Sequence, residues 1–248
     1  MVERVVLTIK VERQGLVPEE ESSPDAEQEA QEEAGSEPVV VARQLEVATE
    51  HGPLFRGVDL DIGPGLHALR IPAGPRQSAL LLALAGRLRP KAGTVTVLGE
   101  TDPRAVRKQC AVAAIEGVDE LDDPVTVRTV LAEQRRWFAP WYASVPSDAG
   151  RAEFDLVYGE NQAPEPSARI RELTDMDLFL LRVTLALLGG RPVLVVGDLE
   201  QVRDEERRAR ALDRLAAVSR LRTVLVGVTN PLGPTAPDHT LHQCGLDL

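Results

Sequence analysis

The segment IPAGPRQSALLLALAG, residues 71–86, joins a predicted strand to a predicted helix. A loop at this position can bind phosphate, because the free N–H groups and the dipole of a helix N-terminus favour an anion. Such a site also uses glycines, which let the backbone approach the phosphates, and a lysine that offsets their charge. The segment holds Gly74, but Pro75 lacks a backbone donor and Gln77 is neutral. The loop therefore lies where phosphate can bind, but Pro75 and Gln77 do not favour phosphate binding.

Hydrophobic patterning predicts the elements around this loop. Alternating or continuous apolar runs indicate strands and 3.6-residue spacing indicates helices. In the first half, strands are predicted at Val5–Val11, Pro38–Ala48, Val58–Ile62, Leu66–Ile71 and in KAGTVTVLGE, with turns at His51–Gly57 and Gly63–Gly65 and a helix over Gln77–Leu88.

The second half alternates helices with strands. The predicted order is a strand at Cys110–Glu116, a helix at Thr126–Phe138, short helices elsewhere in 117–172, a helix at Leu178–Gly190, a strand at Arg191–Asp198, a helix at Glu205–Leu221 and a strand at Arg222–Asn230. The nearly continuous apolar run in RPVLVVGD is typical of a parallel strand covered on both faces. This order predicts a right-handed parallel α/β arrangement.

Composition limits the class of protein. The 248 residues, 43% of them hydrophobic, suffice for one large α/β domain or a core with a smaller subdomain. A net charge of −11 argues against nucleic acid as the main partner. The acidic segment Pro18–Pro38 has no Lys or Arg and few apolar residues, so we expect a disordered linker. It serves either as a solvated spacer or to attract a basic partner.

Two distant cysteines, Cys110 and Cys244, do not form a disulfide framework, and a reducing cytoplasm is the simplest setting. The N-terminal run carries charges and does not resemble a secretory signal. The longest apolar stretches are too short or too interrupted to span a bilayer. Any contact with a membrane is therefore expected to go through another protein.

The order of these elements, from about residue 39 to 230, resembles the nucleotide-binding domain of ATP-binding cassette (ABC) transporters. The resemblance rests on several stretches in family order: LFRGVDLDIGPG, LLLALAGRLRPKAGTVTVLG, PVTVRTVL, ELTDMDLFLLRVTLALLGGRPVLVVGD and TVLVGVTNP. It implies an α/β fold of the P-loop NTPase type, with a mostly parallel sheet flanked by helices, an antiparallel β subdomain and a helical subdomain.

The resemblance also implies a division of the chain. Residues 1–17 form an N-terminal strand segment and 18–37 the acidic linker or loop. Residues 38–235 form the ABC-type domain, with its helical subdomain at about 117–172, and 236–248 form a C-terminal tail.

The family's phosphate-loop pattern G-x-x-x-x-G-K-[ST] places its four defining positions on Ile71, Arg76, Gln77 and Ser78, so both glycines and the lysine are absent. Arg76 could supply a cation from a different position. If nucleotide binds, Ser78 and Asp198 would hold Mg²⁺ with its phosphates. Otherwise Ser78 can cap a helix and Asp198 can accept from loop N–H groups. The altered nucleotide-binding positions are Gly74, Pro75, Arg76, Gln77, Ser78, Ala79 and Asp198.

The other motifs of the family are altered as well. The signature L-S-G-G-Q falls on 173–177, where Asp175 and Asp177 would repel phosphate. Leu199 stands at the position of the catalytic glutamate and Asn230 at that of the switch histidine. The next residue, Glu200, is expected to point away from the site. Glu116 is aligned with the glutamine loop.

Aromatic residues cluster in RRWFAPWYASVP, within the expected helical subdomain. They form either a partner interface or a small core. The group consists of Trp137, Phe138, Trp141 and Tyr142. His239, His242 and Cys244 are interpreted as incidental residues of the tail, because no second Cys/His element accompanies them.

We therefore expect a non-catalytic, degenerate ABC-type subunit with no catalytic residue and no cofactor. Its expected partner is an integral membrane permease or an active ABC ATPase subunit, in a homo- or heterodimer, with no role for nucleic acid. It would be cytoplasmic and peripheral to the inner face of the membrane through that partner. One alternative is a weakly ATP-binding half of an asymmetric heterodimer, with ATP and Mg²⁺. Another is a soluble protein-binding regulator.

Overall fold

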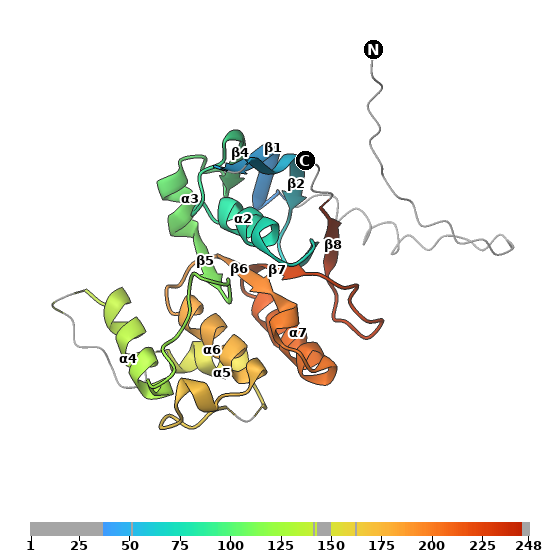
Figure 1. The fold of residues 1–248 in the computed structure, drawn as a ribbon. Coiled ribbons are helices and arrows are strands. Elements are labelled where there is room, and N and C mark those ends of the chain that lie inside the picture. Colours follow the sequence, from blue (N-terminus) through green and yellow to red (C-terminus); the bar gives the residue numbers. More distant parts are fainter. Residues whose placement is uncertain (1–36, 51, 141, 143–149, 162, 245–248) are drawn as a thin grey trace, which may run out of the picture. The chain divides into compact units, whose positions relative to one another are not determined.

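The computed structural model describes residues 37–50, 52–140, 142, 150–161 and 163–244 (Figure 1). The predicted strand Val5–Val11 and all but the last two residues of the acidic segment lie outside these ranges. The chain divides into two units, Met1–Ser36 and Glu37–Leu248, and the fold below is that of the second unit.

An antiparallel sheet has the strand order β2-β1-β4. Its strands are β1 (Val40–Thr49), β2 (Gly52–Ile62) and β4 (Ala92–Val97). The predicted turn at His51–Gly57 is wrong from Gly52 onward, because β2 already pairs there, with Gly52 opposite Thr49. Gly and Pro indicated a turn, but Phe55 is fully buried, and burying its large apolar side chain favours the strand.

A five-stranded sheet has the order β5-β6-β7-β3-β8, and each neighbouring pair is parallel. The strands are β3 (Leu66–Arg70), β5 (Cys110–Ala113), β6 (Val193–Asp198), β7 (Thr223–Val228) and β8 (Thr240–Gln243). The predicted parallel core is confirmed. β5 ends earlier than predicted, at Ala113, because Ala114 has a positive φ of 53° that breaks the strand.

The helices are α2 (Pro75–Leu84), α3 (Pro103–Gln109), α4 (Val127–Phe138), α5 (Arg151–Tyr158), α6 (Asp175–Leu187) and α7 (Glu205–Ser219), with 3₁₀ turns η1 (Ile170–Glu172) and η2 (Leu199–Gln201). α2 begins two residues before the predicted start, with Pro75 in its first turn, where a missing N–H costs nothing. It ends at Leu84, just before Gly86 with a φ of 65°, rather than at the predicted Leu88.

Two hydrophobic clusters cover the two faces of the parallel sheet, and the alternation along β6 shows how. Val193 and Val195 pack with α2 and the antiparallel sheet. Leu194 and Val196 pack with residues of α5, α6 and α7. A strand between two apolar layers must be apolar at every position, which explains the continuous run in RPVLVVGD. A third cluster joins α4 to α6.

The segment expected to be a tail contains β8, which pairs with β3 at the edge of the parallel sheet. A histidine pair joins the two strands: His67 Nδ1 lies 3.1 Å from His242 Nε2, and His67 Nε2 lies 3.2 Å from Pro64 O. Burial lowers the pKa of His242 to about 4, with a further contribution from His67, and burial also lowers the pKa of His67. The folded state thus holds this pair neutral.

The histidine pair predicts a loss of stability in mild acid. The pKa of His242 in the folded state lies below its ordinary value of about 6.5. The contribution of neutral His242 to the free energy of unfolding is therefore present above pH 6.5 and is lost as the pH falls toward 4. Between pH 7 and 4.5 the free energy of unfolding should fall by about 1 kcal/mol more in the wild type than in the His242→Gln variant. This corresponds to a difference in Tm of about 2–4 °C. Parallel pH profiles of Tm, measured by circular dichroism, would contradict this prediction.

Candidate nucleotide site

The loop that follows β3 leads directly into α2. Gly74 is the N-cap residue, with a φ of 116° that an L side chain rarely adopts, and no side chain caps the helix. Ser78 N donates to Gly74 O at 3.2 Å, so this N–H belongs to the helix. The idea that the Ser78 hydroxyl caps this helix is therefore wrong, because Ser78 lies one turn inside it.

Gln77, at the position of the family's lysine, points back into its own loop. It is 2% exposed, and its Nε2 donates to Ile71 O at 3.2 Å. Its amide also packs against β7, where a Cβ on Gly227 would lie only 3.0 Å from Gln77 Cδ. A side chain held in this way satisfies the loop from within and carries no charge toward a phosphate.

A cavity of about 310 Å³ lies beside this loop and brings several predicted positions together. Ser78 and Asp198 line it, as the resemblance implied, and so does Glu116. Its acidic residues outnumber its one cation, Arg182. The lining residues are Ala73, Gly74, Gln77, Ser78, Ile115, Glu116, Glu120, Arg182, Gly197, Asp198 and Gln201.

Arg182 is already neutralised by a carboxylate. Its Nε donates to Asp119 Oδ2 at 3.0 Å and its Nη2 donates to Asp119 Oδ1, so the pair is bidentate. The Arg182 side chain is 8% exposed. Two further donations, to Ile115 O at 3.0 Å and to Gln201 Oε1 at 3.1 Å, fix the guanidinium. The remaining charges of the cavity are therefore negative, and they oppose a phosphate.

The same pair fixes the loop that follows β5. Asp119 accepts from Ala114 N at 2.7 Å and from Ile115 N at 2.9 Å, and Gln201 Nε2 donates to Ala114 O at 2.6 Å. The loop crosses β6 so closely that a Cβ on Gly197 would lie 1.8 Å from Ala114 O. Only glycine fits at that point, so β5, β6 and α6 are tied together without any ligand.

Asp198 and Glu200 form a coupled pair at the end of β6. Burial raises the pKa of Asp198 to about 7, and Glu200 adds to the rise. Burial opposes ionisation of Glu200, but hydrogen bonds from Asp198 and from the N–H groups of Asn230 and Thr229 outweigh it and lower its pKa. Asp198 also accepts from Glu200 N at 3.1 Å, which confirms that it can satisfy loop N–H groups.

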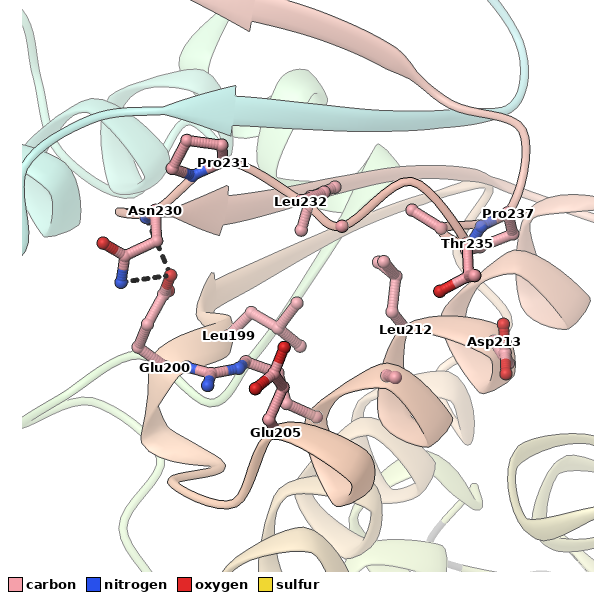
Figure 2. Close-up of a pocket in the computed structure, with 14 residues that line it drawn as sticks. Leu199, Glu200, Glu205, Leu212, Asp213, Asn230, Pro231, Leu232, Thr235 and Pro237 are labelled. Carbon is pink, nitrogen blue, oxygen red and sulfur yellow. Dashed lines mark hydrogen bonds between the residues drawn. The ribbon is translucent and has the colours of Figure 1, made fainter.

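Glu200 does not point away, contrary to the prediction. The chain leaves β6 through the 3₁₀ turn η2 rather than in an extended form, and this turn directs Glu200 toward the loop after β7. Its Oε1 accepts from Asn230 N at 2.8 Å and from Asn230 Nδ2 at 3.3 Å (Figure 2). Its Oε2 accepts from Thr229 N at 3.1 Å. Glu200 thus holds the residue that stands at the switch-histidine position.

A second cavity, of about 320 Å³, lies between this loop and α7. Leu199, Leu212 and Leu232 supply apolar lining, while Glu205 and Asp213 stand at its border (Figure 2). Glu200 and Asn230 line this second cavity and not the cavity beside the phosphate loop. The residues aligned with the family's motifs therefore divide between two cavities.

The aspartates of the signature region act inside the fold. Thr174 caps α6, accepting from Asp177 N at 3.1 Å, and its hydroxyl donates to Asp177 Oδ2 at 2.7 Å. Asp175 accepts from Arg203 N at 3.0 Å and pairs with Arg207 Nη1 at 3.0 Å. These contacts join the beginnings of α6 and α7, so neither carboxylate is left free for an outside cation.

The predicted aromatic group separates into different environments. Trp137 is 84% exposed and Tyr142 is 76% exposed, whereas Phe138 packs against Gly189. Trp141 lies outside the described residues. The core between α4 and α6 is aliphatic, built from residues such as Val130, Leu131 and Leu185. Trp137 and Tyr142 thus do not form a small core, whereas the ring of Phe138 makes a contact within the fold.

The tail residues do not form a metal site among the residues that the structure describes. His242 pairs with His67, while His239 Nδ1 lies 2.7 Å from Pro237 O. No group of three or more His, Cys, Asp or Glu in this part of the chain is placed to hold a metal ion. In the same residues, no helix is both long enough and apolar enough to cross a membrane.

Asp119, Arg182 and Gln201 are the site residues that sequence reasoning missed. An arginine inside the strongly apolar helix LFLLRVTLALL was an available signal, because a buried guanidinium requires a carboxylate. The partner could not be identified in advance, since Asp119 lies 63 residues away in a loop with several other acidic residues.

Asp119→Ala should destabilise the fold strongly. It would leave Arg182 buried without a counter-charge and two backbone N–H groups without their acceptor, at a cost of about 3 kcal/mol or more. Asp155→Ala is the matched control, because it breaks the exposed Arg151–Asp155 pair, which is worth at most about 1 kcal/mol. Urea unfolding measures both free energies. Equal losses in the two variants would contradict the structural role of Asp119.

No family model matches the chain. Among curated proteins, Nod factor export ATP-binding protein I of Paraburkholderia xenovorans is 28% identical over 177 residues, which cover 68% of this chain and 56% of that protein. The chain thus spans little more than half the length of this relative.

Solved structures of ABC proteins share the fold. A putative ABC transporter ATP-binding protein from Pyrococcus furiosus has a TM-score of 0.63 at 14% identity, covering 82% of this chain and 96% of that one. CbiO1 of Clostridium perfringens, part of the ABC transporter complex cbiONQ, has a TM-score of 0.62 at 12% identity, covering 79% and 80%. Together with the parallel and antiparallel sheets, these likenesses confirm that the chain has the fold of an ABC transporter ATP-binding cassette.

Proposed function

We propose that this chain is a non-catalytic subunit of the ABC type, which keeps the cassette fold for binding a partner and does not hydrolyse ATP. The observation that carries the proposal is the charge of the cavity beside the phosphate loop. Glu116, Glu120 and Asp198 line it, Arg182 is neutralised by Asp119, and Gln77 brings no charge. A triphosphate would meet uncompensated carboxylates there.

The residues present do not fit Mg²⁺–ATP. Phosphate binding at a helix N-terminus depends on free N–H groups, and Pro75 removes one of them at the start of α2. Ser78 and Asp198 could give Mg²⁺ two oxygen ligands, but Mg²⁺ in such sites also relies on substrate phosphates.

The residues aligned with the catalytic positions cannot activate water either. Leu199 is apolar and buried, at 1% exposure. Glu200 accepts hydrogen bonds from Thr229 and Asn230. The Asn230 amide cannot act as a general acid or base near neutral pH. These contacts support a structural or regulatory role for the region.

The partner that we propose is an integral membrane permease or another ABC ATPase subunit, in a homo- or heterodimer, which would place the chain at the cytoplasmic face of the membrane. The solved relative cbiO1 is part of a transporter complex. Trp137 supports this proposal, because an exposed tryptophan at the end of α4 loses the unfavourable hydration of its ring when a partner covers it.

A weakly ATP-binding half of an asymmetric heterodimer is the alternative that the structure supports best. The cavity of about 310 Å³ remains open, and Ser78 and Asp198 still line it. In this alternative a second subunit supplies the missing cationic groups. ATP affinity measured on the chain with and without its co-purified partner separates the two proposals, because only the alternative predicts tighter binding in the presence of the partner.

Calorimetric titration of the full chain with ATP and Mg²⁺ should give a Kd above about 1 mM and no turnover. Gln77→Lys combined with Glu116→Gln makes the cavity more positive by two charges and should tighten binding about tenfold. Glu133→Lys, which makes the same change on the exposed face of α4, should leave the affinity unchanged.

Low-micromolar binding or hydrolysis by the wild type would overturn the non-catalytic proposal. An equal gain in the cavity variant and in Glu133→Lys would show that overall charge, rather than the cavity, governs the affinity.

Trp137→Ala should reduce the recovery of an integral membrane protein with the tagged chain from detergent-solubilised membranes at least about fivefold, as expected for an interface tryptophan. Leu221→Ala is the matched control, because Leu221 is a 73% exposed apolar residue on another part of the surface. Both variants should keep the wild-type Tm. If the wild type recovers no integral membrane protein, the soluble regulator is favoured instead.

A further inference from the structure

Four arginines lie at the amino-terminal end of the parallel sheet, and we refer to them as the arginine row. Arg107 lies in α3 just before β5, Arg191 lies just before β6, and Arg222 lies just before β7. Because these strands are neighbours in the sheet, the three residues lie near one another at the same end of it. Arg87, which follows α2, completes the row.

Backbone carbonyls fix the arginine row in place. Arg222 Nη1 donates to Arg191 O at 2.7 Å, and Arg191 Nη1 donates to Cys110 O at 2.7 Å and to Arg107 O at 3.1 Å. Arg107 donates to Gly86 O at 3.4 Å through both Nε and Nη2. Each guanidinium has five N–H donors, so most donors of Arg107 and Arg191 are not used by these bonds.

Among the described residues, no carboxylate forms an ion pair with a member of the arginine row. The ion pairs among the described residues involve other cations, namely Arg43, Arg56, Lys91, Arg151, Arg182, Arg207 and Arg210. Burial lowers the pKa of Arg87, and the positive charges of Arg191 and Arg107 lower it further. The negative charge of Asp119 raises the pKa of Arg87, but Asp119 is paired with Arg182.

Arg222 adds an independent observation. Its Nε is buried and has no hydrogen-bond partner within the part of the chain that the structure describes. A buried donor without an acceptor is unfavourable, and so are neighbouring like charges. An anionic chain that binds along the row relieves the repulsion between the neighbouring like charges.

The shape and the overall charge decide which anion fits. The row extends across three neighbouring strands, so it matches an extended ligand better than a compact one. A membrane or a nucleic acid would also face the rest of a protein of net charge −11, which repels large anionic surfaces. A narrow polypeptide contacts only the row, and each of its carboxylates can accept two parallel hydrogen bonds from one guanidinium.

We propose that the arginine row is a docking site for an acidic, extended segment of a partner protein. It lies at the opposite end of β6 from Asp198, about 20 Å away along the strand, so it is separate from the candidate nucleotide site. It therefore gives the subunit a second contact surface, independent of Trp137.

The test is fluorescence anisotropy with a labelled decaglutamate peptide and the full chain at low salt. Arg87→Gln/Arg107→Gln should weaken binding at least about tenfold, because it removes two of the uncompensated charges. Both side chains lie on exposed residues, so the variant should fold, and an unchanged Tm verifies this. Arg128→Gln/Arg136→Gln is the matched control on the exposed face of α4 and should change the affinity less than about twofold.

Equal losses in the two double variants would overturn the proposal, because binding would then depend only on net charge. Absence of peptide binding by the wild type would overturn it as well. Two further arms use pyrophosphate and phosphatidylglycerol vesicles. Binding of either of these without binding of decaglutamate would assign the row to a compact anion or to a membrane, and would also overturn the proposal.

Discussion

The ion pair between Arg182 and Asp119 determines what the carboxyl end of the parallel sheet can hold. Arg182 is the cation of the cavity beside the phosphate loop, and Asp119 uses its charge within the fold. The same carboxylate accepts from the backbone of the β5 loop, which lies against Gly197 of β6. The chain's own carboxylate therefore binds the arginine and the loop N–H groups, which a ligand could otherwise bind. The net charge left in the cavity is negative.

The fold does not depend on phosphate chemistry. The parallel strands are stabilised by two apolar layers, one with α2 and the antiparallel sheet and one with α5, α6 and α7. Several altered motif positions belong to these layers, since Ile71 and Ala79 lie in one cluster and Leu199 lies in the other. Their apolar side chains contribute to the packing whether or not a phosphate binds, so the site can change while the cassette fold remains. This packing explains how a chain with these substitutions still matches ABC structures over about four-fifths of its length.

Sequence patterns predicted the features that depend on local periodicity. The buried strands β6 and β7 and the helices α6 and α7 follow from apolar spacing. The resemblance to the ABC family implied that Ser78 and Asp198 lie in one site, and both line the same cavity. The orientation of Glu200 was not predictable, because a 3₁₀ turn or an extended exit after β6 gives the same local pattern. β8 was missed because Thr240–Gln243 is short and polar, and its pairing with β3 is a tertiary contact. The partner of Arg182 was missed for the same reason.

The thermal unfolding midpoint with and without Mg²⁺–ATP tests the central claim most directly, since any ligand that binds the folded state raises it. If the chain's own residues close the site to phosphate, about 0.5 mM Mg²⁺–ATP should leave the wild-type Tm unchanged within about 1 °C, relative to Mg²⁺ alone. A rise of about 4 °C or more that disappears in Ser78→Ala would place nucleotide at the loop and contradict the account.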